Sequence, residues 1–569
     1  MNKYIGFIIV LILSFWAVKS LFLPGFFPMH DDTQPSRIFE MAKSLSIGQI
    51  PVRFVSDLGY GYGYPIFNFY APLAYYIGAL FLLLGATAIT AAKIIIIIPI
   101  LLSGVFMYIL GKEFFGKYGG IISAISYMYA PYNAINIYVR GDIAELWAYS
   151  FIPIVFYSAW KIASSESSRY VILGAFTYAL LILSHNLTAL MASGFLIIFV
   201  IFLITIPFQE KQKERVIRLC YFLILGISLS AFYWIPAIAE INYTNVISQV
   251  GGGADFRDHF VCINQLWNSP WGFGGSTIGC IDGMSFKIGK ISIIFAGFAI
   301  LLIASFILRK MSDYLYVINV RGFIFIGAIF GFLLSVFFTI EASKPIWEII
   351  PIMAFFQYPW RFLIFVAFFS SILSGYSVWL ITNSVFIEYH SKHFVYITTV
   401  VVVWLIIISN QMLFIPNRLV NKQDSEYISK QKLNWNISKI SDEYMPKYFE
   451  KPNRVIDIPS SSIELLSNNG NIISVMEDVG FVSARVNFKN SGEIRINKAY
   501  FPTWHIFIDG KEVKYSQTKK GLVVSVTSGE HIVEARYAQT LVQIIANTIS
   551  LAGLLAMAIN LIYNVKKIK

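Results

Sequence analysis

Long apolar runs recur along most of this chain, and they restrict its fold more than any other feature. The run from Ile94 to Leu110 is one example. Of the 569 residues, 57% are hydrophobic and 13% are charged, and the mean hydropathy is +0.65. An apolar helix of about 20 residues matches the thickness of a bilayer. The sequence therefore predicts a mainly α, polytopic helical membrane protein.

The basic residues indicate how the chain crosses the bilayer. The formal net charge is +12, but Lys and Arg stand in short clusters between the apolar runs, as in Glu210–Arg218. Such clusters are typical of cytoplasmic loops, so we expect no nucleic-acid partner. The assignment gives twelve spans with both termini inside, and the first is expected to be a retained anchor. The predicted spans are 4–23, 93–111, 119–138, 145–161, 170–185, 187–206, 219–239, 290–308, 322–340, 361–382, 394–414 and 541–563.

One apolar segment, residues 71–89, does not fit this count. A thirteenth span there would put a basic cluster or the N-terminus on the wrong side of the membrane. We therefore expect 71–89 to form a helix in the outer interface, with thirteen spans as the alternative.

The spans divide the chain into five parts. We expect a seven-span module over 1–240 with an outward first loop at 24–70, an outward loop at 241–289, further spans over 290–414, an outward domain over 415–540, and a last span with a basic tail over 541–569. Alternating apolar residues follow Gly480, and Asp509-Gly510 is a strong hairpin signal. The outward domain is therefore predicted to be a β-sandwich or jelly-roll-like module.

The cysteines agree with this orientation. Cys262 and Cys280 share one outward loop, where an oxidising face favours a disulfide between them. Cys220, at the start of a span, is expected to be a buried thiol.

The tripeptide His30-Asp31-Asp32 opens the first outward loop. Asp32 or Thr33 could simply cap an amphipathic surface helix that includes Arg37. One cap does not need two acids and a histidine, however, and a carboxylate pair beside a hydrocarbon boundary can act as a base. We favour catalysis over capping.

Further polar residues are predicted on the same side. Glycine-spaced Tyr62 and Tyr64 belong either to an interfacial aromatic belt or to a sugar- or prenyl-binding groove. At the second outward turn, Glu145 sits at the membrane boundary and needs a partner or a purpose. Arg140 is a natural partner either for Glu145 or for a phosphate. Two more candidates are His185, for which we favour packing over catalysis, and Arg361.

Several classes of protein are disfavoured. The chain has no metal-binding motif, phosphate-binding loop, CxxC pair or cytoplasmic nucleotide-binding domain. A transferase of this kind would need an activated donor already on the outer face, and a lipid-phosphate-linked sugar meets that condition.

These motifs resemble a known family. The matching residues are His30-Asp31 with Arg37, Gly48–Arg53, Gly61–Leu73, Arg140-Gly141 with Glu145, His185-Asn186, Pro359-Trp360-Arg361, and Tyr500–Trp504 with Ile508–Lys511. The chain is similar to "6-pyruvoyl-tetrahydropterin synthase-related" multi-pass membrane proteins, to YfhO-like proteins and, more distantly, to the GT-C superfamily of glycosyltransferases. The resemblance implies a GT-C-like bundle.

The resemblance also implies roles for the residues. Asp31 would be the catalytic base of an inverting transfer from a polyprenyl-phosphate sugar, with Asp32 in reserve and Glu145 as a further acid. Arg140 and Arg361 would bind the donor phosphate. An Arg-Gly-Asp sequence at the second turn leaves open whether Asp142 or Glu145 is the relevant acid. His30, Arg37, Tyr62, Tyr64, Asp142, His185 and Trp360 would line the substrate site.

No cofactor is expected, although a divalent metal stays an alternative. The acceptor would be a glycan, lipid or protein outside the plasma membrane, as part of the cell envelope. A non-catalytic scaffold or transporter for lipid-linked glycans is the competing function.

Overall fold

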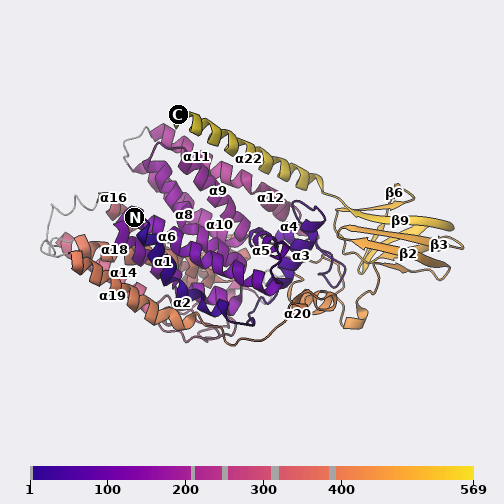
Figure 1. The fold of residues 1–569 in the computed structure, drawn as a ribbon, viewed down its shortest axis with the longest axis horizontal. Coiled ribbons are helices and arrows are strands. Elements are labelled where there is room, and N and C mark those ends of the chain that lie inside the picture. Colours follow the sequence, from indigo (N-terminus) through magenta and orange to yellow (C-terminus); the bar gives the residue numbers. More distant parts are fainter. Residues whose placement is uncertain (1–3, 207–211, 247–253, 309–318, 384–391, 569) are drawn as a thin grey trace.

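The molecule is a long helical bundle with a β module at one end (Figure 1). The computed structural model describes residues 4–206, 212–246, 254–308, 319–383 and 392–568. Both termini lie away from the β module, and we call the opposite end of the bundle, next to the β strands, the module end (Figure 1). The bundle helices are α1 (Ile5–Leu13), α2 (Phe15–Val18), α6 (Ala88–Met128), α8 (Ile143–Ser164), α9 (Arg169–Ser184), α10 (Asn186–Thr205), α11 (Gln212–Leu229), α12 (Ala231–Ala239), α14 (Lys290–Leu308), α16 (Asn319–Thr339), α18 (Leu363–Asn383), α19 (Lys392–Asn410) and α22 (Leu541–Ile568).

The helical membrane class is confirmed, while the count of twelve spans stays a prediction. Within the described ranges, seven helices are long and apolar enough to cross a bilayer, or eight if α11 and α12 form one span. Those two helices are bent by 69°, so the predicted span 219–239 contains a break, and whether it crosses the bilayer stays a prediction. The predicted span 93–111 falls in α6, whereas 119–138 begins in α6 after Gly116, whose φ of 71° breaks the helix, and continues past the end of α6 at Met128 through α7.

The chain also contains shorter helices. They are α3 (Gln34–Ser46), α4 (Ile66–Phe69), α5 (Leu73–Leu83), α7 (Pro131–Ile135), α13 (Ile263–Trp267), α17 (Lys344–Ile349), α20 (Ser425–Ile428) and α21 (Ser438–Ile440). Of these, α3, α4, α5 and α20 lie toward the β module (Figure 1). At 1.5 Å per residue, α5 is about 16 Å long, well short of a bilayer core. This length favours a segment that does not cross, as expected for 71–89.

Helix α3 corrects one expectation. Its sequence suggests a helix with one polar face on the membrane surface, yet polar residues such as Arg37 and Glu40 are buried as well. The reason is tertiary, because segments from the far end of the chain cover the face that the pattern assigns to solvent.

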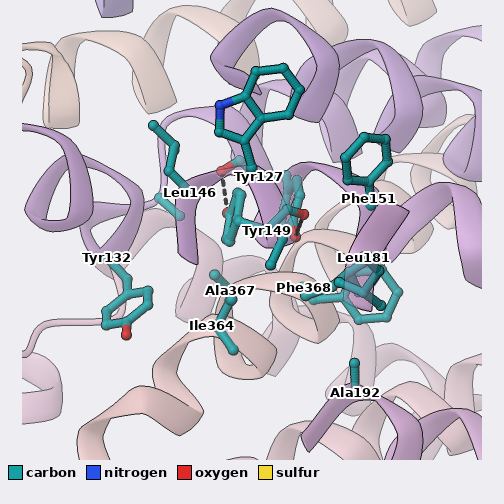
Figure 2. Close-up of a cluster of buried hydrophobic side chains, with 14 of the residues drawn as sticks. Tyr127, Tyr132, Leu146, Tyr149, Phe151, Leu181, Ala192, Ile364, Ala367 and Phe368 are labelled. Atoms are coloured by element: carbon teal, nitrogen blue, oxygen red, sulfur yellow. Dashed lines mark hydrogen bonds between the residues drawn. The ribbon is translucent and has the colours of Figure 1, made fainter. Parts of the chain in front are cut away.

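Prolines inside three helices show how the bundle satisfies its backbone. A proline lacks the N–H that would bind the carbonyl four residues earlier. Pro99 of α6 leaves Ile95 O without its helical donor, and this carbonyl accepts a hydrogen bond of 2.8 Å from Trp147 of α8. Opposite Pro153, Tyr149 O accepts one of 2.8 Å from the Tyr127 hydroxyl (Figure 2). Each freed carbonyl thus finds a donor on another helix, as an apolar surrounding requires.

Pro236 in α12 follows the same rule at the module end. It frees Phe232 O, which accepts a hydrogen bond of 2.9 Å from Arg53 of the first loop. The bend between α11 and α12 is therefore tied to the loop that precedes α4.

The β module is a sandwich of two antiparallel sheets. The strand orders are β1-β4-β8-β7 and β2-β3-β9-β5-β6. The predicted hairpin at Asp509-Gly510 is confirmed, since it joins β5 and β6. The strands are β1 (Ile463–Leu465), β2 (Gly470–Asp478), β3 (Phe481–Phe488), β4 (Gly492–Ile496), β5 (Trp504–Ile508), β6 (Lys511–Val513), β7 (Ser516–Thr518), β8 (Gly521–Val526) and β9 (Gly529–Tyr537).

The cysteines occupy two different settings. Cys262 and Cys280 form a disulfide in the loop that precedes α14. Cys220 is exposed on α11, so the expectation of a buried thiol is wrong.

Candidate functional site

Backbone hydrogen bonds at the module end join two turns of the bundle, one at His30-Asp31 and the other at Val139-Arg140. The His30 and Asp31 N–H groups donate to Val139 O and Arg140 O, at 3.0 and 2.9 Å. Gly141 follows with a φ of 69°, and a Cβ there would lie 2.1 Å from Met29 Sδ. Only glycine suits both the left-handed turn and this close approach. The pairing places Asp31 beside the Arg140 turn, as the sequence analysis expects.

Arg140 is the centre of a buried ionic cluster. Its Nη2 lies 2.7 Å from Asp142 Oδ2, and its Nη1 lies 3.0 Å from Glu145 Oε2. Asp142 Oδ1 also accepts from the Glu145 N–H at 2.9 Å, which caps α8. The expected Arg140–Glu145 pair is therefore present, and Asp142 shares it.

Arg361 joins this cluster from the start of α18. Its Nε is 3.7 Å from Glu145 Oε2, and its Nη1 donates to Phe356 O at 3.2 Å. Trp360 lies against the Arg140 guanidinium, 4.6 Å from ring centroid to carbon. In the part of the chain described, Glu145 Oε2 and Arg361 Nε are buried without a hydrogen bond. Glu145 Oε2 still has its ion pair with Arg140, whereas Arg361 Nε has only the 3.7 Å contact with Glu145, so Arg361 Nε is the atom that suits a polar ligand.

The Asp31 carboxylate differs from the acids around it. It is half-buried, and among the described residues it has no hydrogen bond or ion pair. Burial raises the pKa of Asp31, and the negative charge of Asp142 raises it further, against Arg37, Arg140 and His30. A carboxylate with free lone pairs and a raised pKa is a suitable proton acceptor.

Asp32 has a different environment. It accepts a hydrogen bond of 2.8 Å from the Tyr427 hydroxyl and pairs with Lys422 Nζ at 2.6 Å. The N-cap residue of α3 is Thr33, and its side chain makes no capping bond. The proposed capping role of Asp32 is therefore wrong, and its engagement with Lys422 disfavours it as a reserve base.

Three further residues predicted for the site, His185, His30 and Tyr62, lie in different surroundings. His185 is buried near Asp142, and its Nδ1 lies 2.8 Å from Thr188 Oγ1, a contact typical of a packing histidine. His30 is exposed, with Nε2 3.2 Å from Phe273 O. Tyr62 is the exception, because its ring packs against Phe449. The structure therefore does not bring Tyr62 into the cluster around Asp31.

Arg37 and Tyr64 both contact Ser441. The Tyr64 hydroxyl donates to Ser441 O at 2.7 Å, and Arg37 Nη2 donates to Ser441 Oγ at 2.8 Å. Both contacts reach the segment that precedes the β module, which the sequence analysis does not connect with this site.

Among the residues that the structure describes, one set of side chains could hold a metal ion. Oxygen or nitrogen atoms of Asp142, Glu145 and His185 lie within 4.8 Å of one another. The donor types suit a divalent cation, but the guanidinium of Arg140 already lies between the two carboxylates. A cation there would face the positive charges of Arg140 and Arg361, so the residues fit a metal poorly.

Sequence reasoning missed a second buried network, which fixes the first loop to the last helix. Both oxygens of Glu240 are hydrogen-bonded, to Thr540, to Asn68 Nδ2 at 2.7 Å and to Gln543 Nε2 at 2.9 Å. Arg53 Nη1 donates to Asn68 Oδ1 at 2.9 Å. An acid directly after the predicted span 219–239 was the available signal.

Comparison with known proteins gives one family and several distant folds. Residues 67–258 match the model of the family described as "6-pyruvoyl-tetrahydropterin synthase related domain; membrane protein". A protein of Lactococcus lactis subsp. cremoris described as uncharacterized is 22% identical over 243 residues. That match covers 42% of this chain and 40% of the relative.

The solved structures to which this chain is similar have low sequence identity and TM-scores below 0.5. The apo oligosaccharyltransferase of Archaeoglobus fulgidus is 13% identical with a TM-score of 0.45, and the match covers 81% of this chain and 62% of that one. ArnT from Cupriavidus metallidurans bound to undecaprenyl phosphate is 12% identical with a TM-score of 0.37, covering 77% of this chain and 76% of that one.

The family match confirms the resemblance found in the motifs. It begins at Phe67, within the aromatic stretch of the first loop, and includes the Arg140 turn and His185. Over residues 67–258, this chain is therefore similar to the membrane proteins of the family described as 6-pyruvoyl-tetrahydropterin synthase related domain.

Proposed function

We propose that this protein is a membrane glycosyltransferase that moves a sugar from a polyprenyl-phosphate donor to an acceptor outside the plasma membrane. The observation that carries the proposal is the Asp31 carboxylate, which is held by its backbone beside the Arg140–Glu145–Arg361 cluster without a partner of its own among the described residues. A base next to fixed cations is what transfer from a phosphate leaving group requires.

The proposed step conserves atoms and charge. The acceptor hydroxyl oxygen attacks the anomeric carbon and forms the new glycosidic bond, while Asp31 takes the hydroxyl proton. The bond between that carbon and the donor oxygen breaks, and polyprenyl phosphate leaves with the electron pair. Attack opposite the leaving group inverts the anomeric configuration.

The arginines have unequal roles in this proposal. Arg361 has a buried Nε without a hydrogen bond and only one long carboxylate contact. It is therefore the primary ligand for the leaving phosphate. Arg140, which is paired with both Asp142 and Glu145, holds the acids in place and adds positive charge. Since these cations already stabilise the phosphate, the reaction is proposed to need no metal.

The orientation follows from the same proposal. The module end, with both acidic turns and the β sandwich, would face away from the cytoplasm, and the basic clusters at the other end would face inward. We keep the division into parts proposed from the sequence, which are 1–240, 241–289, 290–414, 415–540 and 541–569. Within 415–540, the strands begin at Ile463.

Reconstitution in vesicles tests the reaction. Purified protein is supplied with a polyprenyl-phosphate sugar and candidate acceptors, and transfer is followed by mass spectrometry. Asp31→Asn is expected to lower kcat/KM by about 10²–10⁴-fold, because the base is lost. Asp32→Asn is the matched control, with an expected loss below about tenfold, because Asp32 binds Lys422 instead.

The same measurement separates the competing function. A scaffold or transporter for lipid-linked glycans would need the polar cluster but no base. Equal behaviour of wild type and Asp31→Asn would overturn the proposed transfer.

A further inference from the structure

The segment just before the β module lies on the first loop, close to Asp31. Val420 pairs with Phe26 through two backbone hydrogen bonds of 2.9 and 2.7 Å. Farther along, Ser36 Oγ donates to Tyr427 O at 2.7 Å, and the Tyr60 hydroxyl donates to Asp442 Oδ2 at 2.7 Å. We call residues 420–445 the strap. The strap is thus attached to the first loop along its whole length.

Arg37 is the point where the strap meets the site. Its guanidinium lies over the Tyr70 ring at 4.2 Å, and its Nη2 lies 3.4 Å from Glu443 Oε1. Arg37 itself is buried, whereas the Glu443 side chain is 24% exposed. Glu443 is therefore a charged group of the strap that faces both Arg37 and the solvent side of the site.

Hydrogen bonds continue from Arg37 to both acidic turns. Arg37 Nη1 donates to the Tyr75 hydroxyl at 3.4 Å, and that hydroxyl donates to Gln34 Oε1 at 2.7 Å. Gln34 Nε2 in turn donates to Gly141 O at 2.8 Å and to Asp31 O at 3.2 Å. A continuous set of contacts thus connects Glu443 with the backbone that holds Asp31.

We propose that Glu443 is a positioning residue, through which the strap sets the charge that Arg37 presents to Asp31. Glu443 attracts Arg37 and so competes with Asp31 for the same cation. Its own negative charge acts on Asp31 in the same sense. The strap thereby keeps Asp31 a stronger base than Arg37 alone would allow. This inference rests on the proposed role of Asp31 as the base.

The charges around these groups agree with the proposed direction. The groups that face Asp31 are Asp142, Arg37, Arg140 and His30, and those that face Glu443 are Arg37, Asp31 and Asp442. The groups that face Arg37 are Tyr75, Tyr70, Glu443 and Tyr64. Burial raises the pKa of Glu443, Arg37 opposes this, and Asp31 adds to it. Because Glu443 lies 3.4 Å from Arg37, removal of its charge leaves the Arg37 charge unpaired, and Asp31 should become easier to ionise.

Carbodiimide labelling of the full-length protein in lipid nanodiscs tests this inference without any activity. Labelling of Asp31 is followed by mass spectrometry across pH 4 to 9 to give a protonation midpoint. Glu443→Gln is expected to lower this midpoint by about half a pH unit, since one nearby negative charge is removed. Glu443→Asp, which keeps the charge, is expected to stay near the wild-type midpoint.

Asp442→Asn is the matched control, because Asp442 contacts Tyr60 and Lys451 rather than Arg37. Its expected midpoint is closer to wild type than that of Glu443→Gln. Thermal unfolding confirms that each variant folds, and Glu443→Ser replaces Glu443→Gln under the same criterion if that variant does not.

The outcomes separate this inference from the proposed function. An unchanged or raised midpoint in folded Glu443→Gln would overturn the role of Glu443, whether or not sugar transfer occurs. A lowered midpoint together with unchanged transfer in Asp31→Asn would support the electrostatic coupling and overturn the transferase mechanism. In an active enzyme, the acidic limb of the kcat/KM profile should move to lower pH by the same amount.

Discussion

Two carboxylates at the module end, Glu240 and Asp31, show opposite ways of holding a charge inside a membrane protein. Both oxygens of Glu240 accept hydrogen bonds from three side chains, which join the first loop to α22. Asp31 is held only through its backbone, and its side chain has no partner among the described residues. A saturated carboxylate stabilises the fold, whereas an unpaired one next to cations is available for chemistry.

Glu240→Ala should lower the free energy of unfolding, whereas the same change at Asp31 should not. The variant leaves the Asn68 and Gln543 donors buried without an acceptor and Arg53 without a nearby counter-charge. The expected loss is about 3 kcal/mol of the free energy of unfolding, measured by denaturation in detergent. Asp31→Ala is the matched control and should change stability by less than about 0.5 kcal/mol. Equal losses in both variants would contradict the distinction.

Arg361→Lys should lower activity and leave stability almost unchanged. Lysine keeps the charge but cannot reproduce the planar donors of the guanidinium, so phosphate binding should weaken. The expected loss in kcat/KM is about 10- to 100-fold in the vesicle assay, with little change in thermal stability. Arg53→Lys, in the Glu240 network, should show the reverse pattern of lower stability and nearly normal activity per folded molecule. A stability loss in Arg361→Lys as large as that in Arg53→Lys would count against a ligand-binding role.

Glu40 lies between these two extremes and predicts a pH dependence. Its Oε2 accepts from the Asp57 N–H at 3.2 Å, whereas its buried Oε1 has no hydrogen bond in the described chain. Burial and the negative charge of Asp57 raise the pKa of Glu40 to about 8, against Lys43. The folded protein then binds more protons than the unfolded one between pH 4.5 and 8, so stability falls as pH rises through this window.

The measurement is the unfolding free energy of wild type and Glu40→Gln across that window. The Glu40 contribution should fall by at most about 1.4 kcal/mol per pH unit, and the variant should lose it. Parallel pH profiles in the two proteins would show that Glu40 is ionised in the fold.

Trp147→Phe gives the smallest expected effect and tests the bundle without any charge. The variant removes the donor to Ile95 O, which Pro99 leaves without a helical partner. Stability should fall by about 1 kcal/mol, as measured by thermal unfolding. Phe151 lies nearby in α8, and Phe151→Leu is a control of similar burial that removes no hydrogen bond. An effect no larger than that of Phe151→Leu would contradict the assigned hydrogen bond.

Local patterns accounted for much of the fold and part of the site. Hydrophobic runs predicted the bundle, and Asp509-Gly510 predicted its hairpin, because both signals depend on neighbouring residues alone. The Arg140–Glu145 pair followed from the places of both residues at one turn between two predicted spans. The buried side of α3 and the partner of Asp32 could not be predicted, because the residues that cover them follow almost 400 positions later.

The sequence by itself determined the membrane class and the β module, and it gave the prediction that Asp31 is the base. The length of apolar runs, the alternation in strands and the distribution of charge between runs are properties of short segments. They decide directly which residues lie in water and which in an apolar environment. Only the tertiary structure decided that Asp32 pairs with Lys422, that Glu240 closes a network with α22, and that Glu443 reaches Arg37. Contacts between distant segments depend on how whole helices pack, and no periodic pattern in the chain encodes them.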